Sequence, residues 1–493
     1  MTHWTRRLFT AGLLAVPLMV SAQTAAATAA APAPATTPAS TSTSAATPTA
    51  GALPDSARIG AYVQKIFDEQ KLTADGPGVV VLVARGDQLL YQGGRGMASI
   101  ELGVPIATDM RFRIGSVTKQ FASATLLKLI DQGRAKLDDP LSKYLPDYPK
   151  GEGITLRQLL NHTSGVKSYT GIRGYMHNPI RRDLDTKALI AEFKDLPVDF
   201  PPGERFAYNN SGYVLVGAVI EAITGKTWHQ AVQELVLAPA GLQQVVYPGE
   251  QRLVPRMVEG YSVDRETGAV TTAGLLSMTQ PQAAGALVSD AQDLWRWNRA
   301  LHGGKLLSPA LYQQMITPEG AAKEAGYGYG ITVGTLRGEP KLEHGGGIHG
   351  FVSGLTYLPQ SGVSVVLLRN TDGPGFSLGM AGRKLAAFVI GKPYPDIVPV
   401  TLSTEQLQAF AGGYKQQADA TAQRELQLHD GKLRWLRQGR PILTLVPTGK
   451  DSLAMEGTIG VIKVERNADG SVAALVFFGQ GGEPGEAGER WLK

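Results

Sequence analysis

The amino-acid sequence predicts an α/β (α+β) protein in which a helical insert packs against a mixed sheet, with a small antiparallel β-barrel or sandwich after it. Three observations favour this class. Strand-like runs lie at both ends of residues 54–398, while helical periodicity occupies the middle. Near Pro399 the composition changes, and beyond Ala411 only short strands separated by turns follow. We therefore predict two domains, residues 54–398 and 399–493.

The N-terminus predicts export. Residues 1–22 have the pattern of a signal peptide: Arg6 and Arg7 precede an apolar run, residues 8–20, that is too short to span a membrane. The same start resembles a twin-arginine signal, so both export routes stay open. Residues 23–53 are almost wholly Ala, Thr, Ser and Pro, which predicts a disordered linker. We expect a periplasmic or secreted protein with no stable membrane insertion once the leader is cleaved.

Helix and strand signals follow in a readable order after the linker. The mostly β-branched run Val79–Val83 and the run Leu89–Tyr91 predict a hairpin of buried strands. Apolar residues recur at three- and four-residue spacing from Ser116 to Gly133, which predicts a helix that ends at a glycine. The remaining elements are expected as a helix at 212–223, strands at 354–358 and 363–368, and a helix near 383–389.

The C-terminal strands predict a separate small β-domain. Residues 426–428 turn at Asp430-Gly431 into residues 433–436, and residues 461–464 turn into residues 472–478. Short strands at this spacing are typical of a small antiparallel barrel.

Composition excludes several classes of function. The net charge of +5 is spread along the 493 residues and forms no basic stripe, so we expect no nucleic-acid partner. The sequence has no cysteine, which excludes disulfides, thiolate metal sites, a cysteine nucleophile and a lipoprotein anchor. A small-molecule or peptide substrate remains as the expected partner, and the oligomeric state stays open.

Ser116-Val117-Thr118-Lys119 is the first motif that could carry chemistry. Ser116 and Lys119 are three residues apart at a predicted helix start, so both face one side of the first turn. The helix N-terminus favours developing oxyanion charge, and a lysine with a pKa lowered by burial could take the hydroxyl proton or relay it. The plain alternative is that Ser116 caps the helix and Lys119 is solvated.

Two further motifs lie downstream. Tyr208 and Asn210 lie in a loop before the second helix, where Tyr208 could act as a base and Asn210 could hold a substrate amide; a packed tyrosine with a helix-capping Asn209 is the alternative. His344-Gly345-Gly346-Gly347 could bring backbone N–H groups close to a ligand, or form a flexible hairpin.

In this order, the three motifs resemble those of the serine β-lactamase and D-alanyl-D-alanine carboxypeptidase superfamily, most closely its class C-related branch, which includes esterases and D-aminopeptidases. The resemblance covers about residues 54–395 and includes the flanking stretches Phe112–Gly115 and Leu159–Gly165. It implies an antiparallel sheet flanked by helices with a helical insert. The tail resembles the lipocalin-like β-domain found after many such hydrolases.

The resemblance also implies roles. Ser116 would be the acylated nucleophile, deprotonated by Lys119 together with Tyr208. Asn210, His344 and Gly346 would contact the substrate. The backbone N–H groups of Ser116 and Gly347 would form the oxyanion hole. The family implies neither a metal nor an organic cofactor.

His344 is the main departure from the β-lactamases of this branch, which have lysine there. A histidine is mostly neutral at pH 7 unless a neighbour such as Glu343 raises its pKa. We therefore expect weak capture of anionic substrates, improving towards pH 6, and a preference for esters or neutral amides.

Competing functions start from other residues. Gly375–Gly379 fits the G-x-S-x-G pattern of an α/β-hydrolase esterase with Ser377 as nucleophile and His429 as its histidine, but no strand runs directly into Ser377. His344 and His349 could suggest a metal pair, yet no third ligand has a recognisable spacing. A non-catalytic penicillin-recognising or peptidoglycan-binding protein is a further alternative.

Overall fold

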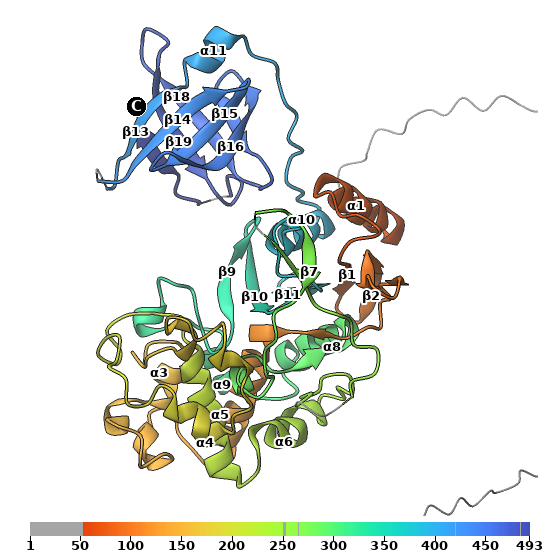
Figure 1. Ribbon diagram of the computed structural model, residues 1–493, viewed down its shortest axis with the longest axis vertical. Helices are drawn as coiled ribbons and strands as arrows, with labels where there is room; N and C mark the ends of the chain where they lie inside the picture. Colours follow the sequence, from red (N-terminus) through yellow and green to blue (C-terminus); the bar gives the residue numbers. More distant parts are fainter. Residues whose placement is uncertain (1–52, 250–252, 265, 420, 484) are drawn as a thin grey trace, which may run out of the picture. The chain divides into compact units, whose positions relative to one another are not determined.

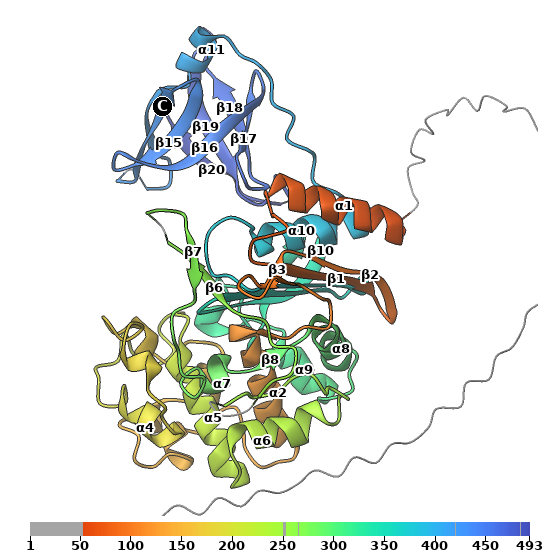
Figure 2. The same ribbon diagram turned by 45° about the vertical axis from the view of Figure 1, so that its right-hand side comes forward.

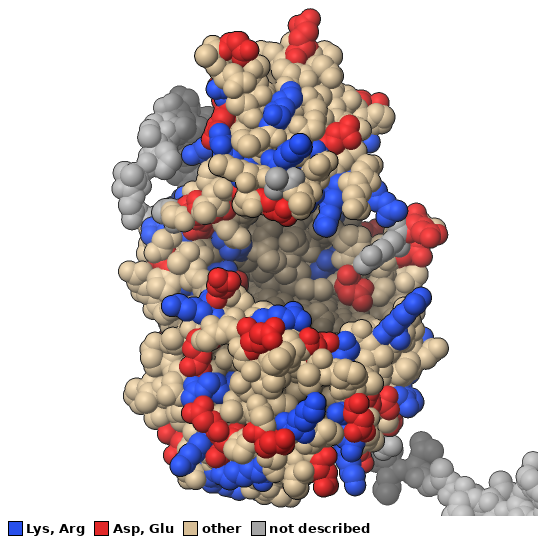
Figure 3. Space-filling view, turned by 90° about the vertical axis from the view of Figure 1, so that its left-hand side faces the viewer, with Lys and Arg blue, Asp and Glu red and all other residues tan. Residues whose placement is uncertain are grey.

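The computed structural model describes residues 53–249, 253–264, 266–419, 421–483 and 485–493. The predicted signal peptide, and all of the predicted linker except Leu53, lie outside the described residues. Within them, no helix combines the length and apolar character needed to cross a bilayer. On the face shown in Figure 3, basic and acidic side chains of the described residues are interspersed.

A six-stranded sheet forms the centre of the hydrolase-like part of the chain, within the described residues. Its strand order is β2-β1-β12-β11-β10-β9, and every neighbouring pair is antiparallel. The α/β class is confirmed, and the sheet is antiparallel rather than mixed. The strands are β1 (Val79–Arg85), β2 (Gln88–Arg95), β9 (Thr332–Leu336), β10 (Glu339–Ile348), β11 (Phe351–Leu358) and β12 (Val363–Arg369).

The sheet is covered on both faces, which explains the continuous apolar runs in its central strands. In β1, Val79, Val81 and Val83 join one core with α1 (Ser56–Glu69) and α10 (Leu378–Val389). The alternate residues of β1 join a second, larger core with the helical insert. Figure 2 shows α1 and α10 on one side of the sheet and α8 on the other.

The helical insert carries the first two motifs. Gly115–Val117 form a 3-10 turn, η1, that leads into α2 (Thr118–Asp131), and α2 packs on α5 (Asn210–Thr224), which ends at Gly225. The other helices are α3 (Leu156–Leu160), α4 (Thr186–Ala191), α6 (Trp228–Val232), α7 (Gln282–Gly285), α8 (Ala291–His302) and α9 (Pro309–Met315) (Figure 1).

Short strand pairs complete this part of the chain. They are β3 (Met97–Ser99) with β4 (Val104–Pro105), β5 (Phe112–Arg113) with β8 (Val288–Ser289), and β6 (Tyr261–Val263) with β7 (Val270–Thr272).

The C-terminal residues form a closed antiparallel barrel, as predicted (Figure 1). Its core is rich in aromatic side chains, including Tyr414, Trp435, Phe477 and Trp491. A short helix, α11 (Thr404–Gln408), precedes it. The strands are β13 (Gly412–Gln416), β14 (Gln423–His429), β15 (Lys432–Arg437), β16 (Arg440–Gly449), β17 (Ser452–Met455), β18 (Val461–Arg466), β19 (Val472–Phe478) and β20 (Glu489–Leu492).

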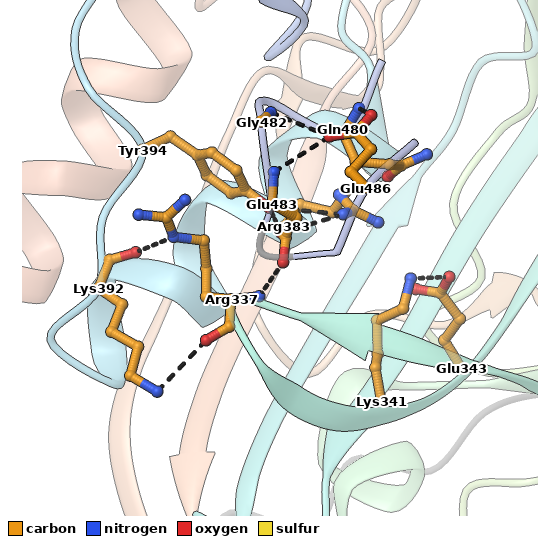
Figure 4. Close-up of polar contacts among 10 residues, drawn as sticks. All are labelled: Arg337, Lys341, Glu343, Arg383, Lys392, Tyr394, Gln480, Gly482, Glu483 and Glu486. Carbon is orange, nitrogen blue, oxygen red and sulfur yellow. Dashed lines mark hydrogen bonds and ion pairs between the residues drawn. The ribbon is translucent and has the colours of Figure 1, made fainter. Parts of the chain in front are cut away.

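A barrel carboxylate contacts the hydrolase-like part of the chain (Figure 4). Glu483 accepts hydrogen bonds from the backbone N–H of Arg337, at the β9–β10 turn, and from the hydroxyl of Tyr394. The guanidinium of Arg383, on α10, lies 3.4 Å from the same carboxylate. Glu486 accepts hydrogen bonds from three backbone N–H groups of the Glu483 loop. The Glu486 carboxylate therefore holds the backbone of residues 480–483, which presents Glu483.

Candidate active site

Ser116 lies in the 3-10 turn that leads into α2. No side-chain hydrogen bond caps the N-terminus of α2, so the Ser116 hydroxyl does not serve as a helix cap. Ser116 is half-buried and lines a cavity, whereas Lys119, one turn later, is fully buried. The plain alternative of a capping serine and a solvated lysine therefore does not describe these residues.

The Lys119 amine contacts three oxygens among the described residues. Its Nζ lies 3.0 Å from Oγ of Ser116, 2.8 Å from Oδ1 of Asn210 and 2.8 Å from the carbonyl oxygen of Ala284. Burial lowers the pKa of Lys119 well below its ordinary value. A neutral amine has two N–H donors and one lone pair. Once the amine is neutral, the two carbonyl oxygens can take its two donors, which leaves its lone pair for the Ser116 hydroxyl, whereas the charged ammonium would donate to all three oxygens.

Tyr208 lies in the loop before α5, with its hydroxyl close to the Ser116 side chain. The Lys119 amine lies 4.8 Å from the centroid of the Tyr208 ring, over its face. Although 43% of Tyr208 is exposed, burial of the phenol raises its pKa above the ordinary value. This site therefore favours a neutral phenol, and Lys119 is the better candidate for the first base.

Asn210 is fixed at both ends of its amide. Its Oδ1 accepts from Lys119, and its Nδ2 donates to Oγ1 of Thr170 at 3.0 Å. An amide nitrogen carries two hydrogens, so one N–H of Asn210 remains for a ligand. The neighbouring Asn209 caps α5, because its Oδ1 accepts from the Gly212 N–H at 3.0 Å.

The glycine motif lies on strand β10 rather than in a flexible hairpin, and it packs against the turn that holds Ser116. A Cβ added to Gly115, whose φ is +50°, would lie 2.9 Å from the Gly347 nitrogen. A Cβ on Gly346 would lie 2.0 Å from the carbonyl oxygen of Ile114. Both glycines are therefore required by close backbone approach. The approach brings the backbone N–H groups proposed for the oxyanion hole to the same place.

Ser116, Asn210 and Gly347 line one cavity of about 80 Å³. Its walls are mostly apolar, and no Lys, Arg, Asp or Glu lines it in the part of the chain that the structure describes. The remaining lining residues are Gly115, Tyr169, Thr170, Met176, Ile180, Leu276, Pro281, Ala284, Gly285, Ile348 and His349.

His344 is buried beside this cavity without lining it. Its Nδ1 lies 2.6 Å from the carbonyl oxygen of Gly345, which only accepts, so Nδ1 carries the proton. Its Nε2 then accepts from the Tyr327 hydroxyl at 2.8 Å. Burial lowers the pKa of His344 to about 4, and Glu343 pairs with Lys341 instead. The expected gain in anion capture towards pH 6 does not follow from this environment.

Four residues that contact the site residues were not assigned from the sequence. Tyr327 and Thr170 hold His344 and Asn210, the Ala284 carbonyl oxygen holds Lys119, and His162 packs its ring against Tyr208. His162 lies within the stretch Leu159–Gly165, so that stretch was the available signal. A backbone carbonyl such as that of Ala284 carries no sequence signal at all.

The competing sites remain separate from this one. Ser377 caps α10, with its hydroxyl accepting from the Met380 N–H, and His429 lies on strand β14 of the barrel. No group of three His, Cys, Asp or Glu side chains among the described residues could hold a metal ion.

A larger cavity, of about 750 Å³, lies beside α4, α5 and α6. Its carboxylates are already engaged: Asp185 caps α4, and Glu221 accepts from the Trp228 N–H and the Thr186 hydroxyl. No serine lines it within the described residues.

Known proteins with similar sequences and structures have related activities. The chain is 25% identical over 409 residues to a D-aminopeptidase of Gluconobacter oxydans (strain 621H), covering 81% of this chain and 74% of that protein. It is 28% identical over 375 residues to Esterase EstB of Burkholderia gladioli, covering 67% and 95%. The solved structure of a D-stereospecific amidohydrolase from Streptomyces sp. has a TM-score of 0.57 and 32% identity, covering 63% of this chain and 94% of that one.

The family model described as Beta-lactamase matches residues 63–389, which include Ser116, Tyr208 and His344. These likenesses support serine hydrolase activity at the level of the family. With two thirds of its length matched and the three motifs gathered around one cavity, the chain belongs to the beta-lactamase family.

Proposed function

We propose that this protein is a serine hydrolase that forms an acyl-enzyme on Ser116 and cleaves esters or amides with small, uncharged acyl groups. The contact set of Lys119 carries the proposal. In the neutral form of the amine, the two carbonyl oxygens would hold its two N–H groups, which leaves its lone pair for the Ser116 hydroxyl at 3.0 Å. A buried lysine in this arrangement is an activating base for a serine nucleophile.

Acylation would begin when Lys119 takes the Ser116 proton. Oγ then attacks the acyl carbonyl carbon, and the carbonyl electrons move to its oxygen. The backbone N–H groups of Ser116 and Gly347 would hold that oxyanion, beside the positive end of α2. Collapse of the intermediate breaks the bond to the leaving group and leaves an ester on Ser116.

Tyr208 would carry the second proton transfer. Its hydroxyl lies close to the Ser116 side chain, so a neutral Tyr208 would donate a proton to the leaving group and recover it from Lys119. The reverse transfer would activate the water that hydrolyses the acyl-enzyme. Asn210 would hold an amide group of the substrate, away from the carbonyl under attack, through its remaining N–H.

The cavity supports an uncharged acyl group. A charge placed among apolar walls without a partner costs several kcal/mol, and no charged side chain of the described residues lines this cavity. A volume of about 80 Å³ is also roughly half of the cavity that accepts benzene in other proteins, so a short acyl chain fits best.

A substrate panel tests this function. We expect p-nitrophenyl acetate and butyrate to be cleaved faster than the succinate half-ester, a D-alanine amide or benzylpenicillin. Ser116→Ala should lower turnover of the best substrate by about 10⁴-fold or more. Ser377→Ala is the matched control and should keep full activity. An active Ser116→Ala protein would refute the nucleophile, and equal rates for acetate and succinate would refute the uncharged acyl group.

A further inference from the structure

His162 has an unusual position next to the Tyr208 loop. It follows α3 with a left-handed backbone, φ 61°, and only 1% of its surface is exposed. Its carbonyl oxygen accepts from the Ala207 N–H at 3.0 Å, and its ring Nδ1 accepts from the Asn209 N–H at 3.1 Å. Ala207 and Asn209 are the two neighbours of Tyr208. One residue therefore fixes the backbone on both sides of Tyr208.

The ring of His162 also supports the ring of Tyr208 directly. The His162 and Tyr208 ring centroids lie 4.3 Å apart, and the Tyr327 ring lies 4.7 Å from His162 and 6.1 Å from Tyr208. Tyr208 is 43% exposed, so burial alone does not hold its ring. The packing against His162 supplies a fixed surface on which the phenol lies.

The hydrogen bonding of the His162 ring carries an energetic cost, and ring packing alone does not explain why a histidine stands at this position. Because Nδ1 accepts from Asn209, the ring proton lies on Nε2, which has no hydrogen-bond partner among the described residues. A buried N–H without a partner is unfavourable, and an apolar ring would avoid it. An apolar ring would lack the Nδ1 acceptor that bonds the Asn209 N–H.

We propose that His162 is a positioning residue that fixes Tyr208 relative to Ser116 through these two backbone hydrogen bonds and the ring contact. This inference rests on the proposed function, in which Tyr208 moves the second proton. Loss of the His162 side chain should let the phenol shift, and a shift of about 1 Å in a catalytic group can cost about 10²-fold in rate.

The first test compares kcat of the wild type and two His162 variants on p-nitrophenyl acetate. His162→Gly keeps the left-handed backbone but loses the side chain, and we expect kcat to fall by about 10- to 100-fold with KM little changed. His162→Asn tolerates the same backbone and retains a side-chain acceptor, so it should recover most of the lost rate. If His162→Gly does not fold, His162→Ala replaces it.

The decisive comparison uses Tyr208→Phe as a background. If His162 acts through Tyr208, His162→Gly should cost less than about 3-fold in kcat once the phenol hydroxyl is gone. Full additivity of the two losses would overturn the proposal, as would an unchanged kcat in the single variant. Inactivity of the wild type would instead refute the proposed function itself.

His302 provides the matched control. It is a half-buried histidine, which stacks on Tyr357 with centroids 4.4 Å apart and hydrogen-bonds with Tyr312 at 2.9 Å. His302→Gly should lower Tm without changing kcat. An equal loss of kcat in this variant would show that the effect at position 162 is a general result of emptying a histidine site.

Discussion

Lys119 shows how three contacts define the chemistry of one residue. The oxygens of Asn210 and Ala284 are acceptors, and the Ser116 oxygen is the one atom of the set that can also donate. Burial lowers the pKa of Lys119, which favours the neutral amine that can accept the Ser116 proton. The base is therefore prepared by its surroundings before a substrate binds.

Lys119→Met tests that role at the residue scale. Methionine fills a similar volume without a proton acceptor, so kcat/KM on p-nitrophenyl acetate should fall by about 10²- to 10⁴-fold. Tm should change little, because the gain from removing a desolvated amine is offset by the loss of a donor for the Asn210 and Ala284 oxygens. Lys341→Met is the matched control, since Lys341 is also buried but pairs with Glu343. Equal losses in the two variants would contradict the assignment.

His344 gives a pH-dependent prediction. Burial lowers its pKa to about 4 in the folded protein, whereas an unfolded histidine titrates near about 6.5. The unfolded chain therefore binds more protons between these values, and this contribution to stability is lost as the pH falls from about 6.5 to about 4. His344→Gln keeps an acceptor for Tyr327 without that titration. Its Tm should fall less than that of the wild type between pH 7 and pH 4.5.

If the Tm of the wild type and that of His344→Gln fell equally between pH 7 and pH 4.5, the assignment of His344 as a buried, neutral histidine would be contradicted. The same environment predicts that KM for a carboxylate-bearing ester does not improve between pH 7 and pH 5.5, because the ring remains neutral there. A clear decrease in KM that disappears in His344→Gln would show that the ring becomes charged and faces the substrate.

At the scale of elements, strand β10 was the hardest part of the site to predict. Glycine is rare in strands, so the motif predicts a backbone that approaches a ligand closely or a flexible hairpin, and does not by itself predict a strand. Their strand geometry comes from pairing with β11 over residues 342–348, which are set opposite residues 351–357. Such pairing depends on a partner strand and is not encoded in the motif itself.

Other elements were predictable because their signals are local. The apolar run of β1 reports a strand buried on both faces, and Gly225 marks the end of α5. Ser116 and Lys119 lie within one helical turn, so their proximity could be predicted. The contact between His344 and Tyr327 spans 17 residues and a strand pairing, so it could not.

Two adjacent glycines of β10 test its role. A Cβ on Gly346 would meet the Ile114 carbonyl oxygen at 2.0 Å, whereas a Cβ on Gly345 would meet its nearest atom at 3.6 Å. Gly346→Ala should therefore push β10 away from the Ser116 turn, lowering kcat by about 10²-fold together with Tm. Gly345→Ala should keep both values. Comparable activity in the two variants would show that the close approach is not needed for catalysis.

At the scale of the whole chain, Glu483 links the barrel to the hydrolase-like part of the chain. It is 7% exposed and has partners at Arg337, Tyr394 and Arg383, outside the barrel. Removing residues 399–493 would leave these partners without their carboxylate. The truncated chain that sequence composition suggests as an independent unit should therefore be less stable than the full chain, even where it keeps a reactive serine.

Glu483→Ala tests this contact in the full chain. The buried Arg383 and Tyr394 groups would lose their partner, which should cost about 1–3 kcal/mol and lower Tm. Because Arg337 lies at the opposite end of β10 from Gly347, kcat should change by less than about 2-fold. Glu489→Ala, on the barrel surface, is the matched control and should leave Tm unchanged. An unchanged Tm for Glu483→Ala would show that the contact does not stabilise the chain.

The most direct test of the central claim is the site of acylation. The wild-type protein would be mixed with p-nitrophenyl acetate, quenched in acid during turnover, digested and mapped by mass spectrometry. We expect one acetyl group on the peptide that contains Ser116, present in Ser377→Ala and absent in Ser116→Ala. An acetyl group on Ser377, or continued turnover of Ser116→Ala with no acetylated serine, would contradict an acyl-enzyme on Ser116.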